Sequence, residues 1–320
     1  MSIISKDITK AVSILNNEDV VAIPTETVYG LAGNIYSKKA IKTIFKTKNR
    51  PFFNPLIVHI PSVNALPKIV SYIPEKAKLL AKAFWPGPLT LVLKKKSTIP
   101  DLITAGKDTV AVRVPNHPIT LKLLQHLDFP LAAPSANPFG SISPTCAQHV
   151  EGYFKNTIKL ILDGGSCQKG IESTIIGFEN DTPVVYRLGS TTIEAIETVV
   201  GTITIKNKKD TAPNAPGMLA RHYAPTTLTV LTNAVSETIK NYPNKRIGIL
   251  VFSKPVNNPV IQHQIVLSKN KNISEAATNL YAALHQLDKQ NLDIIIAERL
   301  PDSELGKAIN DRLQRATFRG

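Results

Sequence analysis

Apolar segments that follow one another without a helix between them constrain this fold most. In the first two hundred residues, short apolar segments alternate with amphipathic patterns, such as "KKAIKTIFKTK" at 38–48 and "PEKAKLLAKAFW" at 74–85. Several apolar segments lack a helical pattern between them, and strands joined by short connections pair antiparallel. We therefore predict an α/β fold with a mixed sheet, not a doubly wound parallel one. The predicted strands are 20–24, 55–60, 89–93, 109–114, 131–133, 158–162, 173–178 and 183–188.

Residues 201–226 interrupt this pattern. They include three prolines and two glycines and offer few core candidates, so they predict a linker. After the linker the alternation restarts on a smaller scale, which predicts a second α/β domain. Its expected strands are 227–231, 246–252, 262–267 and 292–296, and its expected helices are 234–241, 273–288 and 304–317. The predicted organisation is a first domain at 1–200, the linker, and a small Rossmann-like domain at 227–320.

Composition places the chain among ordinary globular proteins. It has 320 residues, of which 43% are hydrophobic and 19% are charged, enough apolar material for a core. We find neither the apolar core of a signal peptide nor a run long enough to cross a membrane. Two cysteines are too few for a disulfide scaffold. We expect a cytoplasmic protein without membrane contact, in which Cys146, Cys167 and His149 are structural.

The net charge of +14 has two interpretations. It is either a solvated basic surface or a means of attracting polyanions such as nucleotides or RNA. The excess of positive charge is spread over both predicted domains and forms no basic tail. Charge alone therefore does not decide between the two.

Several familiar catalytic motifs are absent. The sequence contains no GxxxxGK[ST] phosphate loop and no GxGxxG after a strand. Its histidines and cysteines form no HExxH, HxH or CxxC pair, and GxSxG is missing. These absences argue against a P-loop ATPase, a simple Rossmann dehydrogenase and a zinc hydrolase.

Polar side chains gather instead at the ends of predicted strands, where open α/β sheets bind ligands. Each hydroxyl among them could equally cap a helix or hold a turn. Lys46 and Lys48, taken alone, read as solvated helix charges. The candidates are Thr25, Glu26, Thr27, Tyr29, Lys46, Lys48, Arg50, Asn54, His59, Arg113, Ser135, Asn137, Ser143, Glu172, Ser173, Thr174 and Arg187.

Arg113 is the hardest of these residues to explain structurally. It stands in the apolar segment "VAVRV", and a buried guanidinium needs an anion or a carboxylate partner. Acidic residues are scarce in its neighbourhood, so a ligand anion is at least as plausible as a protein carboxylate. Together the candidates describe a cavity with several cations and few carboxylates. Such a cavity suits a polyanion, for example a triphosphate, beside a small zwitterion.

The sequence resembles the YrdC/Sua5 family, the threonylcarbamoyl-AMP synthases. The resemblance rests on "PTETVYGLAGN", "KTKNRPFFNPLIVHI", "FWPGPLTLVL", "VAVRVPNHP", "PLAAPSANPFGSISPT", "GIESTII" and "YRLGS", which occur in family order. "APGMLARHYAP" at 215–225 is similar to the linker motif of the two-domain Sua5 form. The resemblance runs along essentially the whole chain, although the second domain offers little to match residue by residue.

The resemblance implies a fold and a reaction. The fold is a twisted mixed sheet with helices and a basic cavity. The reaction converts L-threonine, bicarbonate or CO2, and ATP into threonylcarbamoyl-AMP and pyrophosphate. The product serves t6A formation at position 37 of tRNAs that read ANN codons, through a downstream threonylcarbamoyl transferase. Direct binding of tRNA or double-stranded RNA is a further possible partnership.

The resemblance also implies roles for particular residues. Lys48, Arg50 and Asn137 correspond to the catalytic set, and the loop at 135–145 corresponds to the nucleotide-binding wall. The implied ATP contacts are Arg50, Asn54, Thr109, Ser135, Ser143, Arg187 and, from the linker, Tyr223. The implied threonine contacts are Thr27, His59, Arg113, the backbone at Ala133, and Ser173. Mg2+ is expected with ATP, its protein ligands remain unassigned, and the linker is the expected lid.

Two rival interpretations remain open at this stage. One is a non-catalytic RNA-binding protein that uses the same basic cavity. Against it, only 6% of residues are aromatic and no RNA-binding motif is present. The other is a relative that transfers carbamoyl groups to a different acceptor, which the linker motif disfavours.

Overall fold

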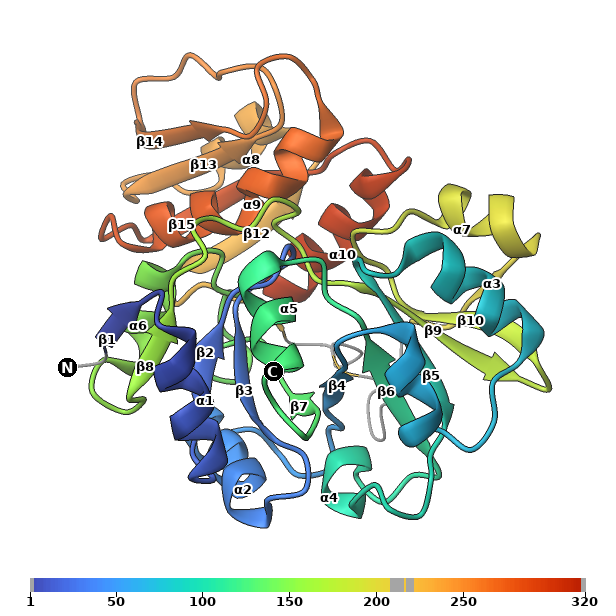
Figure 1. The fold of residues 1–320 in the computed structure, drawn as a ribbon. Coiled ribbons are helices and arrows are strands. Elements are labelled where there is room, and N and C mark those ends of the chain that lie inside the picture. The colour runs from blue at the N-terminus through green and yellow to red at the C-terminus, as the bar shows by residue number, and fades with distance from the viewer. Residues whose placement is uncertain (1–2, 208–215, 217–221, 318–320) are drawn as a thin grey trace.

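The computed structural model describes residues 3–207, 216 and 222–317, and within them the chain forms two separate sheets (Figure 1). The larger sheet has the strand order β1-β8-β2-β3-β7-β4-β6-β5-β9-β10-β11. Its strands are β1 (Ile3–Ser5), β2 (Val21–Ile23), β3 (Gly30–Asn34), β4 (Ile57–His59), β5 (Leu89–Lys94), β6 (Thr109–Arg113), β7 (Leu131–Ala132), β8 (Leu160–Leu162), β9 (Thr174–Glu179), β10 (Thr182–Arg187) and β11 (Thr204–Ile205).

This sheet is mixed, as predicted. Strands β4 and β6 pair parallel, whereas β5 pairs antiparallel with β6 and β9 pairs antiparallel with β10. The parallel pairing puts His59 directly beside Arg113 at the ends of their strands. The antiparallel pairing of β9 and β10 brings the start of β9 beside Arg187 at the end of β10. The sheet thus delivers polar side chains from several strands to neighbouring positions.

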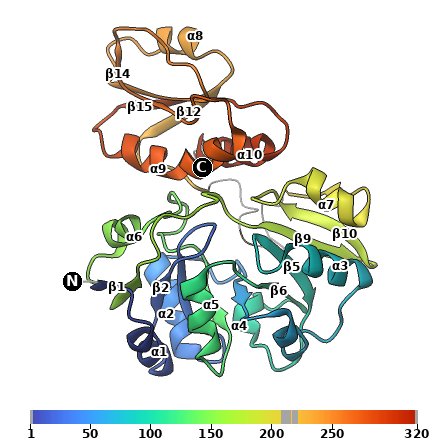
Figure 2. The same cartoon turned by 45° about the horizontal axis from the view of Figure 1, so that its top comes forward.

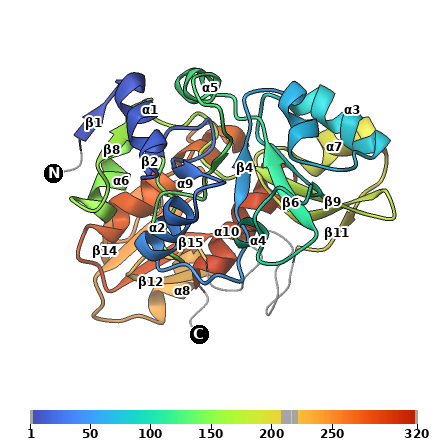
Figure 3. The same cartoon turned by 60° about the horizontal axis from the view of Figure 1, so that its bottom comes forward.

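Amphipathic helices cover the sheet. They are α1 (Ile8–Asn16), α2 (Lys38–Lys48), the 3-10 helix η1 (Val63–Lys68), α3 (Glu75–Phe84), α4 (Asp101–Thr104), α5 (Pro118–Gln125), α6 (Ala147–Phe154) and α7 (Ile193–Val200). Helix α1 packs beside α5, and α3 packs beside α7 (Figure 3). The bounds of α2 agree with the prediction. Ser37 caps its first turn and Asn49 ends it in the left-handed conformation.

The sequence pattern missed β3 because glycine is a poor strand former. Its sequence "GLAGN" nevertheless forms a buried strand. A Cβ atom at Gly33 would lie 3.2 Å from Ile44 and 3.3 Å from Ala40 on α2. The glycine therefore lets α2 pack closely against the sheet, which fixes where the end of that helix lies.

The second sheet is entirely parallel, with strand order β12-β15-β13-β14. Its strands are β12 (Leu228–Thr232), β13 (Ile247–Val251), β14 (Ile261–Val266) and β15 (Ile294–Glu298). Its helices are α8 (Val235–Lys240), α9 (Ile273–Asp288) and α10 (Leu305–Thr317). Helices α9 and α10 lie between this sheet and the larger part of the molecule (Figure 2). They are therefore the elements of the second domain that face the first.

The predicted linker contributes more structure than a spacer would. Thr204 and Ile205 form β11, which pairs parallel with β10. His222 and Tyr223 are buried, with only 7% and 1% of their surface exposed. Residues 208–215 and 217–221, which include most of the linker motif, lie outside the described residues.

In the part of the chain that the structure describes, no helix has the length and apolar character needed to span a membrane.

Candidate active site

A cavity opens where the strand ends of the large sheet meet the linker. Its lining includes the guanidinium groups of Arg50, Arg113 and Arg187. The predicted residues that line it are Thr27, Arg50, His59, Arg113, Ala133, Ser135, Ser173, Arg187 and Tyr223. The structure thus brings together most of the side chains that the sequence singled out, from several strand ends, the segment after α2 and the linker.

The turn after β2 forms one side of the cavity. The Thr25 hydroxyl lies 2.8 Å from that of Thr27 and donates to the Val28 carbonyl at 2.7 Å, while the Val28 amide donates back at 3.2 Å. These local bonds replace a regular strand and hold both threonines in place. Thr25 and Val28 also line the cavity, and the sequence did not assign either of them a ligand.

Arg113 has a protein carboxylate partner, which was one of the two partners that the sequence had left open. Its terminal nitrogen lies 2.7 Å from Glu26 Oε1, and both side chains are buried. It also donates to the Thr27 hydroxyl at 3.0 Å and to the Gly87 carbonyl at 3.2 Å. The turn after β2 places Glu26 beside the end of β6. The two residues are far apart in the sequence, so the sequence did not predict this contact.

His59 lies beside Arg113 in the sheet register. Burial and the Arg113 charge lower the pKa of His59 to about 3. The imidazole is therefore neutral at physiological pH and can bind a ligand by hydrogen bonding without adding charge.

Arg50 and Arg187 form the second basic part of the cavity. Arg50 donates to Asn54 Oδ1 and to the Pro55 carbonyl, each at 2.7 Å. Burial and the nearby Arg187 charge lower the pKa of Arg50 to about 9. Asn54 is fully buried and orients Arg50 without lining the cavity. An anionic ligand here would relieve both desolvation and like-charge repulsion.

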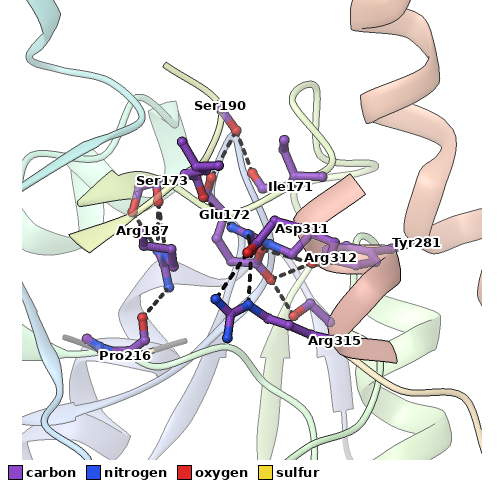
Figure 4. Close-up of polar contacts among 12 residues, drawn as sticks. Ile171, Glu172, Ser173, Arg187, Ser190, Pro216, Tyr281, Asp311, Arg312 and Arg315 are labelled. Carbon is purple, nitrogen blue, oxygen red and sulfur yellow. Dashed lines mark hydrogen bonds and ion pairs between the residues drawn. The ribbon is translucent and has the colours of Figure 1, made fainter. Parts of the chain in front are cut away.

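Arg187 is held by the residue that precedes β9. It donates to the Ser173 carbonyl at 2.8 Å and to the Ser173 hydroxyl at 3.0 Å, and to the Pro216 carbonyl at 3.2 Å (Figure 4). The Ser173 hydroxyl also lies 2.8 Å from that of Thr90. Arg187 thus joins the sheet to the linker through one guanidinium group.

Lys48 and Asn137 do not line the cavity, although the sequence assigned them to the catalytic set. The Lys48 ammonium donates to the carbonyls of Ser135 and Asn137. The Asn137 amide donates to the carbonyls of Pro138 and Ser141, each at 2.9 Å. Both side chains are turned inward because the loop's own carbonyl groups need donors. Burial and the neighbouring Arg50 charge hold the pKa of Lys48 well below its usual value.

The loop from Pro134 to Thr145 is hydrogen-bonded along its length although it lacks regular structure. Its backbone receives bonds from distant parts of the chain, including the Tyr29 amide to the Pro144 carbonyl and the Cys167 amide to the Thr145 carbonyl. The Ala224 amide donates to the Gly140 carbonyl at 2.8 Å, so the linker is bonded to this loop as well. The wall of the cavity is therefore preformed.

Two further predicted ATP contacts lie away from the lining. Ser143 is fully buried behind the wall and donates its hydroxyl to Glu172 at 2.6 Å. Thr109 stands at the far end of β6 from Arg113, at a different hollow beside Lys107 and Tyr186. A motif match identifies a strand, but it cannot tell which end of that strand meets the ligand.

Glu172, a candidate without an assigned role, has two partners in the second domain that its sequence context does not reveal. Glu172 lines the cavity and accepts hydrogen bonds from Tyr281 on α9 and Arg312 on α10 (Figure 4). Burial raises its pKa, but Arg312, Arg187 and the Ser143 bond outweigh this and lower it to about 2. Helical arginines such as Arg312 ordinarily read as solvated charges, so no local signal marked this one.

Comparisons with known proteins agree over the whole chain. Residues 13–189 match the family described as "Telomere recombination", of the Sua5, YciO and YrdC proteins, and residues 191–317 match the threonylcarbamoyl-AMP synthase C-terminal domain. The Threonylcarbamoyl-AMP synthase of Pyrococcus abyssi is 41% identical, with 96% of this chain and 93% of that protein covered. That of Bacillus subtilis is 39% identical, with 97% and 92% covered.

A solved structure extends the agreement to three dimensions. The crystal structure of P. abyssi Sua5 complexed with L-threonine superposes with a TM-score of 0.90 and 40% identity. It covers 97% of this chain, and 94% of that chain is matched. Family match, full-length relatives and fold all concur, and the chain belongs to the YrdC/Sua5 family of threonylcarbamoyl-AMP synthases.

Proposed function

We propose that this chain is an L-threonylcarbamoyladenylate synthase, a nucleotidyltransferase. It would join L-threonine, bicarbonate or CO2, and ATP into threonylcarbamoyl-AMP, with release of pyrophosphate. The observation that carries the proposal is one cavity that holds three guanidinium groups, in a chain about 40% identical to such synthases along its length. That composition suits one carboxylate and one polyphosphate bound side by side.

The threonine site in this proposal is the part around Arg113. Its guanidinium binds the amino acid carboxylate, while Thr27, His59, Ser173 and the backbone at Ala133 receive the remaining polar groups. All five residues line the cavity. The relative whose structure contains L-threonine supports this choice of ligand.

The nucleotide site is the part around Arg50 and Arg187. Ser135 and Tyr223 complete it, and the Tyr223 hydroxyl is buried without a hydrogen-bond partner among the described residues. An unpaired buried donor is costly, so a ligand oxygen at this point would be favourable. Asn54 supports the site by holding Arg50.

The chemistry follows from the placement of the two sites. The neutral amine of threonine adds CO2 and releases a proton to water, which gives an N-carboxylate; this attacks the α-phosphorus of ATP while pyrophosphate leaves. The nucleophile is already an anion, so positioning and charge neutralisation matter more than a strong base. Arg50 and Arg187 neutralise charge on the phosphates. Pro216, His222 and Tyr223 line the cavity, and in this proposal they help to exclude the water in which a carbamate decomposes.

Magnesium is proposed as the cofactor that accompanies ATP. Within residues 3–207, 216 and 222–317 no group of three or more His, Cys, Asp or Glu side chains is arranged to enclose a metal ion. The carboxylate in the lining, Glu172, is already bonded to Arg312 and Tyr281. The cavity therefore fits an ion held mainly by phosphate oxygens and water, which is how Mg2+ commonly binds beside nucleotides. Bound there, the ion would reduce the negative charge of the phosphates.

The product would be used for t6A formation at position 37 of ANN-decoding tRNAs by a separate threonylcarbamoyl transferase, in the cytoplasm. The net charge of +14 is compatible with direct contact to tRNA or double-stranded RNA. Retention of a labelled tRNA on a filter, measured over a range of salt concentrations, tests this contact independently of catalysis.

One assay tests the proposed activity. Full-length protein is mixed with ATP, Mg2+, bicarbonate and labelled threonine, and pyrophosphate and threonylcarbamoyl-AMP are measured. We expect pyrophosphate release that requires both threonine and bicarbonate. Release that is independent of threonine, or that accompanies carbamoylation of another acceptor, would reject the proposal.

A further inference from the structure

Glu172 is a carboxylate in the lining of a cavity that is otherwise basic. It stands between Ile171 and Ser173, two residues before β9, and only 6% of its surface is exposed. Its pKa of about 2 means that it carries a full negative charge. An uncompensated carboxylate beside phosphates would repel them, so something must neutralise it.

The neutralising group comes from the second domain. Arg312 on α10 is 1% exposed and donates from Nε to Glu172 Oε2 at 2.9 Å. Tyr281 on α9 donates its hydroxyl to the same oxygen at 2.9 Å (Figure 4). From the first domain, Ser143 donates to Oε1 at 2.6 Å. Glu172 is thus enclosed by donors from both domains.

Arg312 makes three more contacts, all at the boundary between the domains. It donates to the Leu188 carbonyl at 2.6 Å, in the segment after β10, and to Asp311 at 2.8 Å. Its guanidinium carbon lies 4.7 Å from the ring centroid of Tyr223, which lines the cavity. Arg312 therefore touches both Glu172 and Tyr223 from behind the wall.

Arg187 is the alternative cationic partner for Glu172. It lies close enough for each group to shift the pKa of the other, yet its hydrogen bonds go to Ser173 and Pro216. If Arg312 were absent, the buried carboxylate would attract Arg187. An arginine paired in that way is less available to a phosphate.

We propose that Arg312 is a positioning residue that shields Glu172 and so keeps Arg187 free for the nucleotide. Through this pair α10 becomes part of the nucleotide site, although it contributes no atom to the cavity lining. The identity of the ligand rests on the proposed function. The inference about Arg312 concerns charge compensation between the two domains.

The test is a double-mutant cycle on the full-length chain. Binding of α,β-methylene-ATP, which cannot be cleaved at the reacting bond, and of L-threonine is measured by calorimetry. We expect Arg312→Met to raise the nucleotide Kd by about 10- to 100-fold, and the threonine Kd by less than about threefold. Arg246→Met is the matched control, since Arg246 forms an exposed ion pair with Asp293 in the same domain.

The second arm removes the carboxylate. With Glu172→Gln in place, Arg187 has no competing anion, so adding Arg312→Met should change the nucleotide Kd by less than about threefold. A merely structural role predicts the opposite, because the double variant has lost more contacts than the single one. This comparison holds even if Arg312→Met alone does not fold.

The outcomes separate this inference from the proposed function. Wild-type protein that binds threonine but no nucleotide would overturn both. Wild-type protein that binds nucleotide, with an unchanged Kd in Arg312→Met or a loss of about tenfold or more between Glu172→Gln and the double variant, would overturn the shielding role alone.

Discussion

The guanidinium groups at the two ends of the cavity differ in the charge of their protein partners. At one end, Arg113 is paired with the buried Glu26 carboxylate at 2.7 Å. At the other end, Arg50 donates to Asn54 and Pro55, and Arg187 to Ser173 and Pro216, all neutral acceptors. The first arrangement fixes a cation without leaving much net charge. The second retains positive charge that only an anion can offset, which suits a polyphosphate.

The largest effect is expected when a cation is removed from the end whose arginines have only neutral protein partners. Arg50→Met should lower kcat/KM for ATP by roughly 100-fold or more, because a desolvated contact to phosphate is lost. The KM for threonine should change little. Initial rates of pyrophosphate release give both values. Lys46→Met, at an exposed position on α2, is the control, and a loss shared equally by both substrates would contradict the distinction.

At the end where Arg113 is paired with Glu26, a substitution should affect threonine more than ATP. Arg113→Met should weaken threonine binding by about 10- to 100-fold, with a smaller effect on ATP. The single variant leaves Glu26 buried and unpaired, so Glu26→Gln should be combined with it to protect the fold. Calorimetry with L-threonine provides the measurement. Unaltered threonine affinity in the folded double variant would exclude Arg113 as the carboxylate ligand.

Lys48 adds a further test, because its ammonium is bonded to the loop and lies outside the cavity lining. Lys48→Met removes the ammonium donor from the Ser135 and Asn137 carbonyls, of which Ser135 keeps the bond from the Asn137 amide, at a cost of about 1–3 kcal/mol in stability. We expect a lower thermal midpoint, and a higher KM for ATP because the wall shifts. A variant with wild-type stability whose kcat alone collapses would instead favour a direct catalytic role.

The smallest expected effect concerns pH and the junction behind the nucleotide end. The His149 and His285 rings stack at 3.9 Å beside Tyr153, and His285 contacts the Ser143 carbonyl. Burial and the Lys289 charge lower the pKa of His149 to about 4, and burial, His149 and Lys289 lower that of His285 to about 3. Asp288 partly opposes this at His285.

Both folded-state pKa values lie below the ordinary value of 6.5. The stacked pair therefore contributes its full stability above about pH 6.5 and loses it as the pH falls toward about 4 and then 3. Denaturant titrations at several pH values should show a weaker acid dependence in His285→Gln than in the wild type. Identical curves for the two proteins would mean that the pair does not contribute.

The sequence supported the fold well where the signal is local. Periodicity identified α2, and short apolar segments without helices between them identified the mixed sheet. Strand β3 was not predicted because Gly30 and Gly33, of which Gly33 serves the packing of α2, remove the apolar pattern that marks a strand. The motif resemblance identified most of the cavity lining. These residues lie at strand ends, and the position of a strand in the sheet fixes where its end lies.

Contacts between segments that are distant in the sequence could not be predicted from local patterns or motifs. Glu26 meets Arg113, and Arg312 meets Glu172, only because particular turns and helices come together in space. Lys48 was expected to face the ligand, but spacing along a helix does not reveal which carbonyl groups lie within reach of an ammonium. The direction of a long side chain depends on acceptors that belong to other segments.

The hydrogen bonding of the loop from Pro134 to Thr145 has a consequence for how chains of this kind can vary in length. Surface loops normally accept inserted residues at little cost, because few of their backbone groups are committed to partners. Here Tyr29, Cys167 and Ala224 each bind a particular carbonyl of the loop. One added residue would shift every later carbonyl away from its donor. The segment can therefore exchange side chains while its number of residues stays fixed.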